Sequence, residues 1–387
     1  MNGLSETESG EPPEGLTGSE HEDVVLVRRA RSGLRTIIAV HSTLLGPSLG
    51  GARFYPYEDE AVALEDVLRL SRAMTEKAAL AGLAQGGGKA VIIGDPTLVK
   101  TPDLLRDFAA AVNSLDGRYV TAEDVGTTQD DMDLVRETTP FVAGTATSRG
   151  GSGDPSPATA LGVVIAMEAA AVHRWGDDLK GKTVCVVGAG KVGKEVIRLL
   201  VQRQAVVIAA DVNHDKADAA VRTGAIRLID PSDVAGATAD ILCPCALGGL
   251  LTEDAVPDLH CAIIVGAANN QLARAQVAES LAAADILYVP DFLANAGGII
   301  NIAEEAHGYD RARAVKAVGQ IRDTTTLVLE RAKVRGITPL AAAEELVAKR
   351  LAGGRDSDGH FNESFAATNH SQPGDTRGVK PGTHRRP

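Results

Sequence analysis

Three ionisable residues in the first half of the chain have types and settings suited to chemistry on a small substrate. Lys77 comes seven residues after Leu70 and three after Met74, at the edge of the apolar stripe of an expected helix. Lys89 follows three consecutive glycines and precedes an expected strand, while Asp124 follows another strand, where ligands of α/β folds commonly bind. Two cations and a carboxylate can together hold an anionic substrate and move a proton. Taken singly, each has a plainer interpretation, as a surface lysine or as a turn residue.

A glycine-rich segment in the second half has the pattern of a dinucleotide-binding turn. Residues 183–187 are typical of a buried strand and residues 194–202 of a helix, and the turn between them comprises Gly188, Ala189, Gly190, Lys191, Val192 and Gly193. The three glycines would serve a tight turn, close approach to a pyrophosphate and close helix packing. A second strand, 205–210, ends at Asp211, whose carboxylate would hold a ribose 2′-hydroxyl and repel a 2′-phosphate. The sequence therefore predicts an NAD site; the alternative is a turn that uses glycine only to connect strand and helix.

Other ligand motifs are incomplete. Gly188, Gly193 and Lys194 satisfy most of a triphosphate-binding loop, but Glu195 stands where serine or threonine is needed for magnesium. The acidic run at 130–133 lacks the glycine and glutamate spacing of a calcium loop, which favours a solvated helix start. No metal-ligand spacing occurs among the nine histidines or four cysteines, so no metal is expected.

The elements that must position Lys77, Lys89 and Asp124 form a first region. Two apolar runs joined through Ser32 and Gly33 predict a β-hairpin, and the helix that carries Lys77 has its apolar residues at helical spacing. The expected elements are strands at 24–27 and 36–41, a helix at 58–81, a strand at 90–93, a helix at 102–115 and a strand at 118–121.

The second region begins with an Ala-rich helix from Pro157 to His173, and from Thr183 short apolar strands alternate with helices. A last helical stretch at 303–350 is interrupted by Gly336 and Pro339. The predicted fold is α/β, with two domains around a cleft: an N-terminal α/β substrate domain and a C-terminal Rossmann-type NAD-binding domain. The expected boundaries are 1–23 for a disordered acidic tail, 24–150 and 151–325 for the domains, 326–352 for helices that return toward the first domain, and 353–387 for a second disordered tail.

Composition excludes several functional classes. The 51 acidic residues outnumber the 39 basic ones, and aromatic residues make up 3%, so neither phosphate-backbone binding nor base stacking is expected. The longest apolar stretch, 158–172, is broken by Glu168 and too short to cross a bilayer. The four cysteines are too few for a secreted disulfide scaffold, and the first residues lack a signal-peptide pattern. We expect a cytoplasmic protein with no nucleic-acid or membrane partner.

Several stretches together resemble the amino-acid dehydrogenases (the Glu/Leu/Phe/Val dehydrogenases), and most closely the branched-chain leucine and valine enzymes. The resemblance covers about Val24 to Leu351 and lies in the segments at 41–54, 74–78, 86–96, 121–128, 153–157, 245–248, 266–272 and 295–298. It implies a homo-oligomer. The chain departs from the family at Glu76, where an aromatic residue is usual, and at Ala78, where asparagine is usual. These departures put the surroundings of Lys77 or the packing of subunits in question.

Carried over residue by residue, the resemblance implies that Lys77 binds the substrate carboxylate, Lys89 activates water and Asp124 exchanges protons with the substrate amine. Thr159 would touch the nicotinamide amide, and Asn270 and Asn269 would hold substrate or nicotinamide. The remaining implied contacts to the substrate are Leu49, Gly50, Ala122, Ile299 and Ile302.

These residues predict reversible NAD-dependent oxidative deamination of an L-amino acid to a 2-oxo acid and ammonium. Lys89 would have to lose a proton near neutral pH, which burial and the like charge of Lys77 favour. An aliphatic pocket would leave a glutamate side chain unpaired and would favour valine, leucine or isoleucine. The alternatives are a phenylalanine dehydrogenase and a non-catalytic NAD-binding sensor on the same scaffold.

Overall fold

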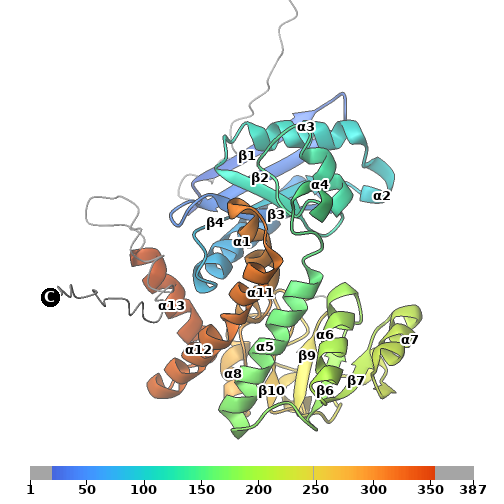
Figure 1. Cartoon of the computed structure of the whole chain (residues 1–387), viewed down its shortest axis with the longest axis vertical. Coiled ribbons are helices and arrows are strands. Elements are labelled where there is room, and N and C mark those ends of the chain that lie inside the picture. The colour runs from blue at the N-terminus through green and yellow to red at the C-terminus, as the bar shows by residue number, and fades with distance from the viewer. Residues whose placement is uncertain (1–19, 247, 354–387) are drawn as a thin grey trace, which may run out of the picture.

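The computed structural model describes residues 20–246 and 248–353, which contain two sheets (Figure 1). The first is mixed and has the order β1-β2-β4-β3-β5, in which β1 and β2 form an antiparallel hairpin while β3 runs parallel to both β4 and β5. Its strands are β1 (Asp23–Arg29), β2 (Leu34–Ser42), β3 (Ser48–Tyr55), β4 (Gly86–Ile93) and β5 (Tyr119–Glu123).

Helices cover both faces of this sheet because its strands alternate their apolar side chains. On β2, Ile37 and Ala39 pack with Val67 of helix α1 (Glu60–Leu80), whereas Ile38 packs on the other face with Phe108 of α3 (Pro102–Asn113). The short helices α2 (Pro96–Val99) and α4 (Gln129–Val135) complete the layer. We call this sheet with α1 to α4 the first unit.

The second sheet is parallel throughout and has the order β11-β10-β9-β6-β7-β8, which is the strand order of dinucleotide-binding α/β folds. Its strands are β6 (Thr183–Val187), β7 (Val206–Ala210), β8 (Arg227–Leu228), β9 (Ile241–Pro244), β10 (Ile263–Ile264) and β11 (Leu287–Tyr288). Its helices are α5 (Ser156–Trp175), α6 (Lys191–Gln202), α7 (His214–Thr223), α8 (Val277–Ala283), α9 (Asp291–Ala294), α10 (Gly297–Ala303), α11 (Arg311–Gly319), α12 (Ile321–Arg335) and α13 (Pro339–Gly353). We call this sheet with α5 to α13 the second unit. The α/β fold class is confirmed.

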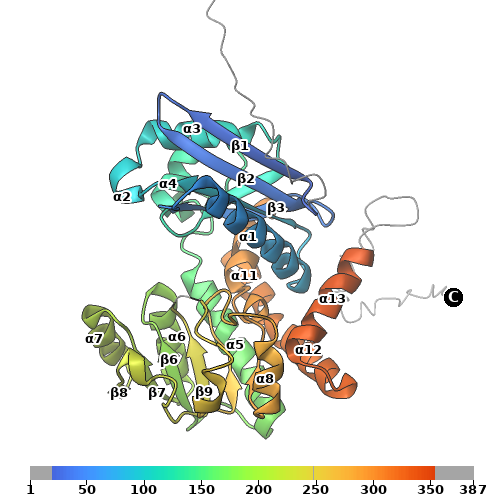
Figure 2. The same ribbon diagram turned by 180° about the vertical axis from the view of Figure 1, so that it is seen from behind.

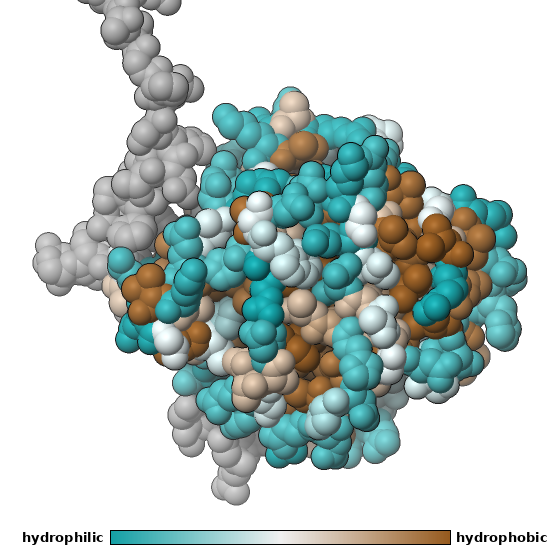
Figure 3. Space-filling model, turned by 90° about the horizontal axis from the view of Figure 1, so that it is seen from below, coloured by the Kyte–Doolittle hydropathy of each residue, from teal (hydrophilic) through white to brown (hydrophobic). Residues whose placement is uncertain are grey.

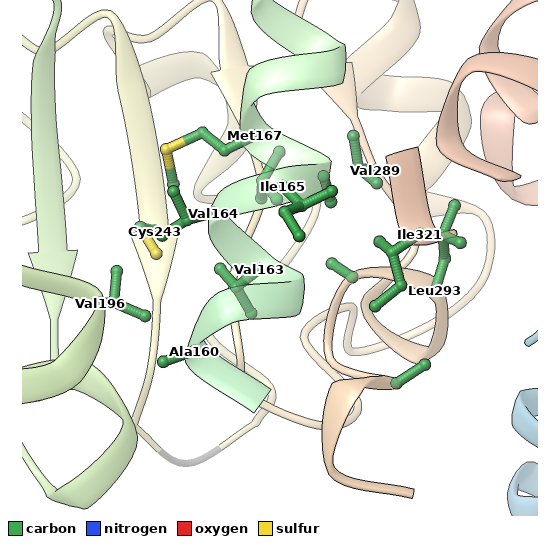
Figure 4. Packing of buried hydrophobic residues seen from close by; sticks show 14 of the residues in the cluster. Ala160, Val163, Val164, Ile165, Met167, Val196, Cys243, Val289, Leu293 and Ile321 are labelled. Atoms are coloured by element: carbon green, nitrogen blue, oxygen red, sulfur yellow. The ribbon is translucent and has the colours of Figure 1, made fainter. Parts of the chain in front are cut away.

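Helix α5 is the centre of the largest apolar cluster. By length and composition it could cross a membrane, yet its residues pack against α6, α10 and α12. Figure 4 shows Val163 and Val164 of α5 among Val196, Cys243 and other buried side chains. A helix buried in this way is explained as the core of a folded domain.

Two contacts connect the last helix to the first unit. Helix α13 packs on α1 (Figure 2), and the Arg350 guanidinium donates a hydrogen bond to the Leu83 carbonyl at 3.1 Å. The surface seen from below is mostly hydrophilic, and apolar residues are exposed in several places, with the largest group at the right of the view (Figure 3).

Most expected elements occur, but three expectations need correction. Strand β3 is not among the expected strands, and Gly86 to Gly88 lie inside β4 rather than in a loop that precedes it. The ordered chain also begins ahead of Val24, because the Glu22 amide donates to the Val40 carbonyl at 2.9 Å. The rest of the two predicted tails, 1–19 and 354–387, lies outside the described residues.

Candidate functional site

The structure pairs two of the three predicted ionisable residues. Lys89 lies within β4 and Asp124 directly follows β5, and both strands flank β3. Lys89 Nζ is 2.5 Å from Asp124 Oδ2, and the lysine side chain is only 8% exposed. Because a charge buried to this degree is unstable without an opposite charge beside it, Lys89 and Asp124 depend on each other as an ion pair.

Arg53 of β3 is a third charged residue at this pair, and it is not among the residues predicted from the sequence. Its Nε lies 3.6 Å from Asp124 Oδ2, and its Nη1 donates to Asp66 Oδ2 of α1 at 2.9 Å. The Tyr57 hydroxyl donates to the same Asp66 oxygen at 2.6 Å. Burial alone would raise the pKa of Asp124, but the charges of Lys89 and Arg53 outweigh it and hold that pKa below its usual value. Asp124 is therefore a carboxylate at neutral pH and able to accept a proton.

Lys77 projects from the last turn of α1 toward the second unit. Its Nζ donates to Asn269 Oδ1 at 3.1 Å, and Asn295 Nδ2 donates to the same oxygen at 2.8 Å. Burial lowers the pKa of Lys77 to about 8; the negative charge of Asp291 opposes this, and the positive charge of Lys89 adds to it. The charge of Lys77 is thus sensitive to the Lys89–Asp124 pair and to a carboxylate of the second unit.

Glycines allow these elements to approach closely. A Cβ on Gly87 would lie 2.0 Å from the Thr75 amide nitrogen of α1, so the glycine brings the helix that carries Lys77 onto the strand that carries Lys89. A Cβ on Gly50 would meet the Gly88 carbonyl oxygen at 1.8 Å. The close approach that these glycines permit is made by other parts of the chain itself.

The predicted dinucleotide turn has the geometry that its three glycines require. Gly188 has φ +100°, and a Cβ on Gly193 would lie 1.9 Å from the Gly188 carbonyl oxygen. A Cβ on Gly190 would meet nothing within 4 Å, and α6, which includes Lys191 and Val192, begins without a side-chain cap. Open space beside uncapped helix amides suits a pyrophosphate.

Asp211 lies at the end of β7, beside this turn. Its Oδ2 accepts the Ala189 amide at 2.7 Å, and its Oδ1 accepts the Asn213 amide at 2.8 Å. These bonds fix the carboxylate at the carboxyl edge of the sheet, where a ribose hydroxyl could donate to it. The residues present therefore fit a dinucleotide.

The remaining predicted contacts lie around the junction of the units. The Thr159 hydroxyl donates to the Pro155 carbonyl at 3.0 Å and faces Gly298, where an added Cβ would come within 2.6 Å of it. Asn269 and Asn270 are exposed, and Asn270 has φ 53°, which is uncommon for a residue other than glycine. Four predicted pocket residues are buried members of one apolar cluster that spans both units: Leu49, Ala122, Ile299 and Ile302.

The two residues that depart from the resembled family, Glu76 and Ala78, are both accommodated by ordinary contacts. Glu76 accepts from Arg72 at 3.3 Å, and Ala78 is fully buried in the apolar cluster. Neither removes Lys77 from the site.

Two further residues support the Lys77 contact without a sequence signal that sets them apart. Asp291, at the start of α9, accepts the Gln271 amide at 3.3 Å and the Phe292 amide at 2.8 Å. Asn295 is 5% exposed and orients Asn269. Arg53, by contrast, has a weak signal, since it is a charged residue in an otherwise apolar run from Leu49 to Phe54.

Comparison with known proteins gives a consistent result over most of the chain. Residues 21–141 match the family model described as "Glu/Leu/Phe/Val dehydrogenase, dimerisation domain", and residues 150–215 and 211–317 match "Glutamate/Leucine/Phenylalanine/Valine dehydrogenase". A leucine dehydrogenase of Bacillus cereus is 43% identical over 339 residues, 87% of this chain and 93% of the relative. A valine dehydrogenase of Streptomyces coelicolor is 47% identical over 345 residues, covering 87% and 93%.

Solved structures show the same similarity. The crystal structure of L-tryptophan dehydrogenase from Nostoc punctiforme aligns with a TM-score of 0.75 and 41% identity, and the match covers 87% of this chain and 98% of that one. The hetero-hexameric glutamate dehydrogenase from Thermus thermophilus, in a form described as Leu bound, aligns with a TM-score of 0.74 and 25% identity, covering 88% and 91%.

Proposed function

The chain belongs to the Glu/Leu/Phe/Val dehydrogenase family, and from that membership we propose reversible, NAD-dependent oxidative deamination of a branched-chain aliphatic L-amino acid. In this reaction the amino acid, NAD and water give the 2-oxo acid, ammonium, NADH and a proton. The observation that carries the proposal is the Lys89–Asp124 pair beside Lys77, at the junction with a dinucleotide fold. The leucine and valine dehydrogenases among the relatives support the substrate class.

Each ionisable residue has one task in the proposed mechanism. Lys77, as an ammonium ion, binds the substrate carboxylate. Asp124, as a carboxylate, accepts a proton from the substrate ammonium, because a positively charged amine resists loss of hydride from Cα. Lys89, in its neutral form, accepts a proton from the water that attacks the resulting iminium carbon, which gives a carbinolamine. Asp124 returns its proton to the amine nitrogen, the C–N bond breaks, and the hydroxyl proton goes to the departing ammonia, so that the 2-oxo acid and ammonium form and the proton on Lys89 passes to solvent. Asp124 Oδ2, 2.5 Å from Lys89 Nζ, is close enough to position the lysine for this transfer.

The cofactor would lie across the turn at Gly188 to Gly193. Bound NAD supplies the hydride acceptor, and the turn and Asp211 would hold its pyrophosphate and adenosine ribose. Thr159, near Gly298, would contact the nicotinamide amide. The carboxylate of Asp211 favours NAD over NADP because a 2′-phosphate would carry negative charge toward it.

The aliphatic preference follows from the side chains that would line the pocket. Leu49, Ala122, Ile299 and Ile302 offer no charge for an acidic side chain, and the β-branched isoleucines narrow the space for a ring. The 41% identity to a tryptophan dehydrogenase makes an aromatic substrate the second candidate. Phenylalanine dehydrogenase activity belongs to the same alternative.

Rates with valine, leucine, phenylalanine, tryptophan and glutamate, each with NAD and with NADP, test this proposal. The absorbance of the reduced cofactor measures each rate. We expect valine or leucine with NAD to give the highest kcat/KM. A higher value for an aromatic amino acid would overturn the aliphatic assignment, and a higher value for glutamate would overturn the pocket argument altogether. Absence of reduction with every amino acid, alongside measurable NAD binding, would favour a non-catalytic NAD sensor.

Replacing Lys89 tests the assignment of the water-activating base. We expect Lys89→Ala to lower kcat by about 10²–10⁴-fold while NAD still binds, because the dinucleotide turn lies in the other unit. Lys216→Ala, at an exposed position of α7, is the matched control and should keep the parental kcat. A kcat of Lys89→Ala close to that of the control would remove Lys89 from the mechanism.

We also propose a cytoplasmic homo-oligomer. The match of residues 21–141 to a model described as a dimerisation domain supports contact through the first unit. The four cysteines are all free thiols in the structure, which suits a reducing compartment.

A further inference from the structure

Two of the four cysteines form a close pair at the end of β9. The Cys243 and Cys245 sulfur atoms lie 3.6 Å apart, and alternate residues of a strand point to the same face. Cys243 is fully buried on the side that faces α5 (Figure 4), whereas Cys245 is only partly buried. Cys185 and Cys261 belong to the apolar cluster on the other face of the sheet. The pair is thus a vicinal dithiol, separate from the other two thiols.

Cys245 also forms part of the support for the dinucleotide turn. Its amide donates to the Val187 carbonyl at 2.7 Å, one residue before Gly188. A Cβ on Gly193 would lie 3.3 Å from Cys245 Cβ, and a Cβ on Gly188 would lie 2.9 Å from the Cys245 carbonyl carbon. The glycines of the turn therefore pack directly on the main chain and side chain of Cys245, so any movement of Cys245 is transmitted to them.

A bond between the two sulfur atoms would shorten this part of the strand. In an extended strand, residues two apart have Cα atoms roughly 6.6 Å from each other, which is near the upper end of the range for disulfides, about 6.8 Å. The sulfur atoms would have to move from 3.6 Å to bonding distance, and the chain between them is already restricted by Pro244. A disulfide between Cys243 and Cys245 is thus possible, but its formation would pull Cys245 away from the dinucleotide turn.

We propose that Cys243 and Cys245 are a reversible oxidation site, at which a hydroperoxide converts the dithiol to a disulfide and thereby weakens dinucleotide binding. The Cys245 thiolate attacks one oxygen of the peroxide and the O–O bond breaks. The other oxygen leaves as hydroxide and takes up a proton to give water, and Cys245 becomes a sulfenic acid. The Cys243 sulfur then attacks the Cys245 sulfur, the S–O bond breaks, and water leaves with the thiol proton. In total two thiols and one hydrogen peroxide give one disulfide and two waters, so the sulfur atoms lose the two electrons that the peroxide gains.

The interaction between the thiols favours this order of events. The hydrogen bond with Cys243 holds the pKa of Cys245 below its ordinary value, while the same bond and burial hold the pKa of Cys243 well above it. The less buried cysteine of the pair is therefore the one with more thiolate character, and the thiolate is the nucleophile that reacts with peroxide. Formation of the disulfide does not depend on the proposed dehydrogenase function, whereas its effect on NAD does.

The experiment treats the full chain with hydrogen peroxide, with and without NAD, and then with dithiothreitol. Intact-mass measurement should find loss of two hydrogen atoms, and peptide mapping should place the bond between Cys243 and Cys245. The KM for NAD should rise at least several-fold while kcat at saturating NAD changes less, and dithiothreitol should reverse both changes. Bound NAD should slow the oxidation, because it would cover the turn.

Matched variants separate this site from general oxidation. Cys261→Ser should respond to peroxide as the parent does, whereas Cys243→Ala should form no disulfide and its KM for NAD should not respond. Cys245→Ala serves the same purpose if Cys243→Ala fails to fold. Oxygen addition to single cysteines without a disulfide would overturn the proposal, as would a disulfide that leaves NAD binding unchanged in a chain that otherwise reduces NAD. A disulfide in a chain without dehydrogenase activity would support the site and count against the proposed function instead.

Discussion

At the scale of single residues, the charge of Lys77 depends on a carboxylate in the other unit. Asp291 is fixed by the amides of Gln271 and Phe292, and its charge opposes the fall of the Lys77 pKa that burial causes. Gln271 lies two residues after Asn269, which accepts a hydrogen bond from Lys77. We therefore propose that Asp291 is a positioning residue, which would act on the substrate through Lys77.

This dependence predicts how substrate affinity changes with pH. In the proposed mechanism Lys77 binds a carboxylate as the ammonium ion. Its pKa of about 8 means that the charged fraction falls as the pH rises through that value. The KM for the 2-oxo acid, measured at saturating ammonia and NADH, should therefore rise above about pH 8. In Asp291→Asn a raising contribution is lost, the pKa of Lys77 falls further, and the rise in KM should begin at lower pH. At acidic pH, where Lys77 is charged in both proteins, kcat and KM should be similar.

Glu76→Gln provides the control for Asp291→Asn. It removes a carboxylate next to Lys77 in sequence, but Glu76 is paired with Arg72 and is not among the charges that act on Lys77. The pH at which KM rises should therefore stay where it is in the parent. An unchanged pH profile in Asp291→Asn, or the same shift in both variants, would contradict the role assigned to Asp291.

The sequence identifies the ionisable residues that stand next to recognisable helices, strands or turns. It misses those that reach the site only because elements distant in sequence pack together. Lys77, Lys89 and Asp124 stand beside recognisable elements, so residue type and position are enough to mark them as candidates. Arg53 and Asp291 contact the site only because β3 lies between β4 and β5 and because α9 lies near α1. Those neighbours are far apart in sequence, and no local pattern encodes their approach.

At the scale of elements, the glycines of β3 and β4 explain which strands the sequence predicts and which it misses. Long helices such as α1 and α5 have periodic apolar residues and are recognisable, as is the β1–β2 hairpin. Strand β3 contains Gly50 and Gly51, and glycine usually weakens a strand, so its strand character is hidden. Gly50 and Gly51 are required because the backbones of the neighbouring strands leave no room for a Cβ, and Gly87 of β4 is required because the backbone of α1 leaves none.

Gly87→Ala tests this packing. Its added Cβ would lie 2.0 Å from the Thr75 amide nitrogen, and a backbone atom cannot move aside cheaply. We expect the free energy of unfolding to fall by about 1–3 kcal/mol, as overpacked cores do. Activity should also fall at temperatures where the variant is fully folded, because α1 positions Lys77. This fall in kcat should be larger than in other variants with the same free energy of unfolding.

Gly319→Ala is the matched control in the same chain. Gly319 ends α11, has no positive φ, and an added Cβ meets nothing within 4 Å. Its free energy of unfolding should change by less than about 1 kcal/mol, and kcat should be unchanged. Denaturant unfolding followed by circular dichroism, with rates on the same samples, measures both effects. A Gly87→Ala protein as stable and as active as this control would mean that α1 does not need the glycine.

At the scale of the whole molecule, one carboxylate of the second unit accepts two amides of the path between the units. The family models match up to residue 141 and again from residue 150, so the segment between them connects the units. Glu305 of the 3-10 helix Glu304–His307 accepts the Gly144 amide at 2.9 Å and the Ser152 amide at 2.7 Å through one oxygen. One amide within this segment and one just after it are thus bonded to a single side chain of the second unit, 161 and 153 residues away in sequence.

Removing this carboxylate should loosen the connection without unfolding either unit. Glu305→Ala leaves two amides without their acceptor, at a cost of about 1–3 kcal/mol for each amide that water does not reach. We expect limited proteolysis to cut between Gly144 and Ser152 at protease concentrations that leave the parent intact. The KM for the amino acid should rise more than the KM for NAD, because Lys77 and Asn269 belong to different units while the dinucleotide turn lies within one. Glu305→Gln keeps an acceptor oxygen at the same place and should retain much of the protection against cleavage. Equal cleavage of the Ala and Gln variants would show that Glu305 does not hold the connection. Cleavage spread over both units would show the same.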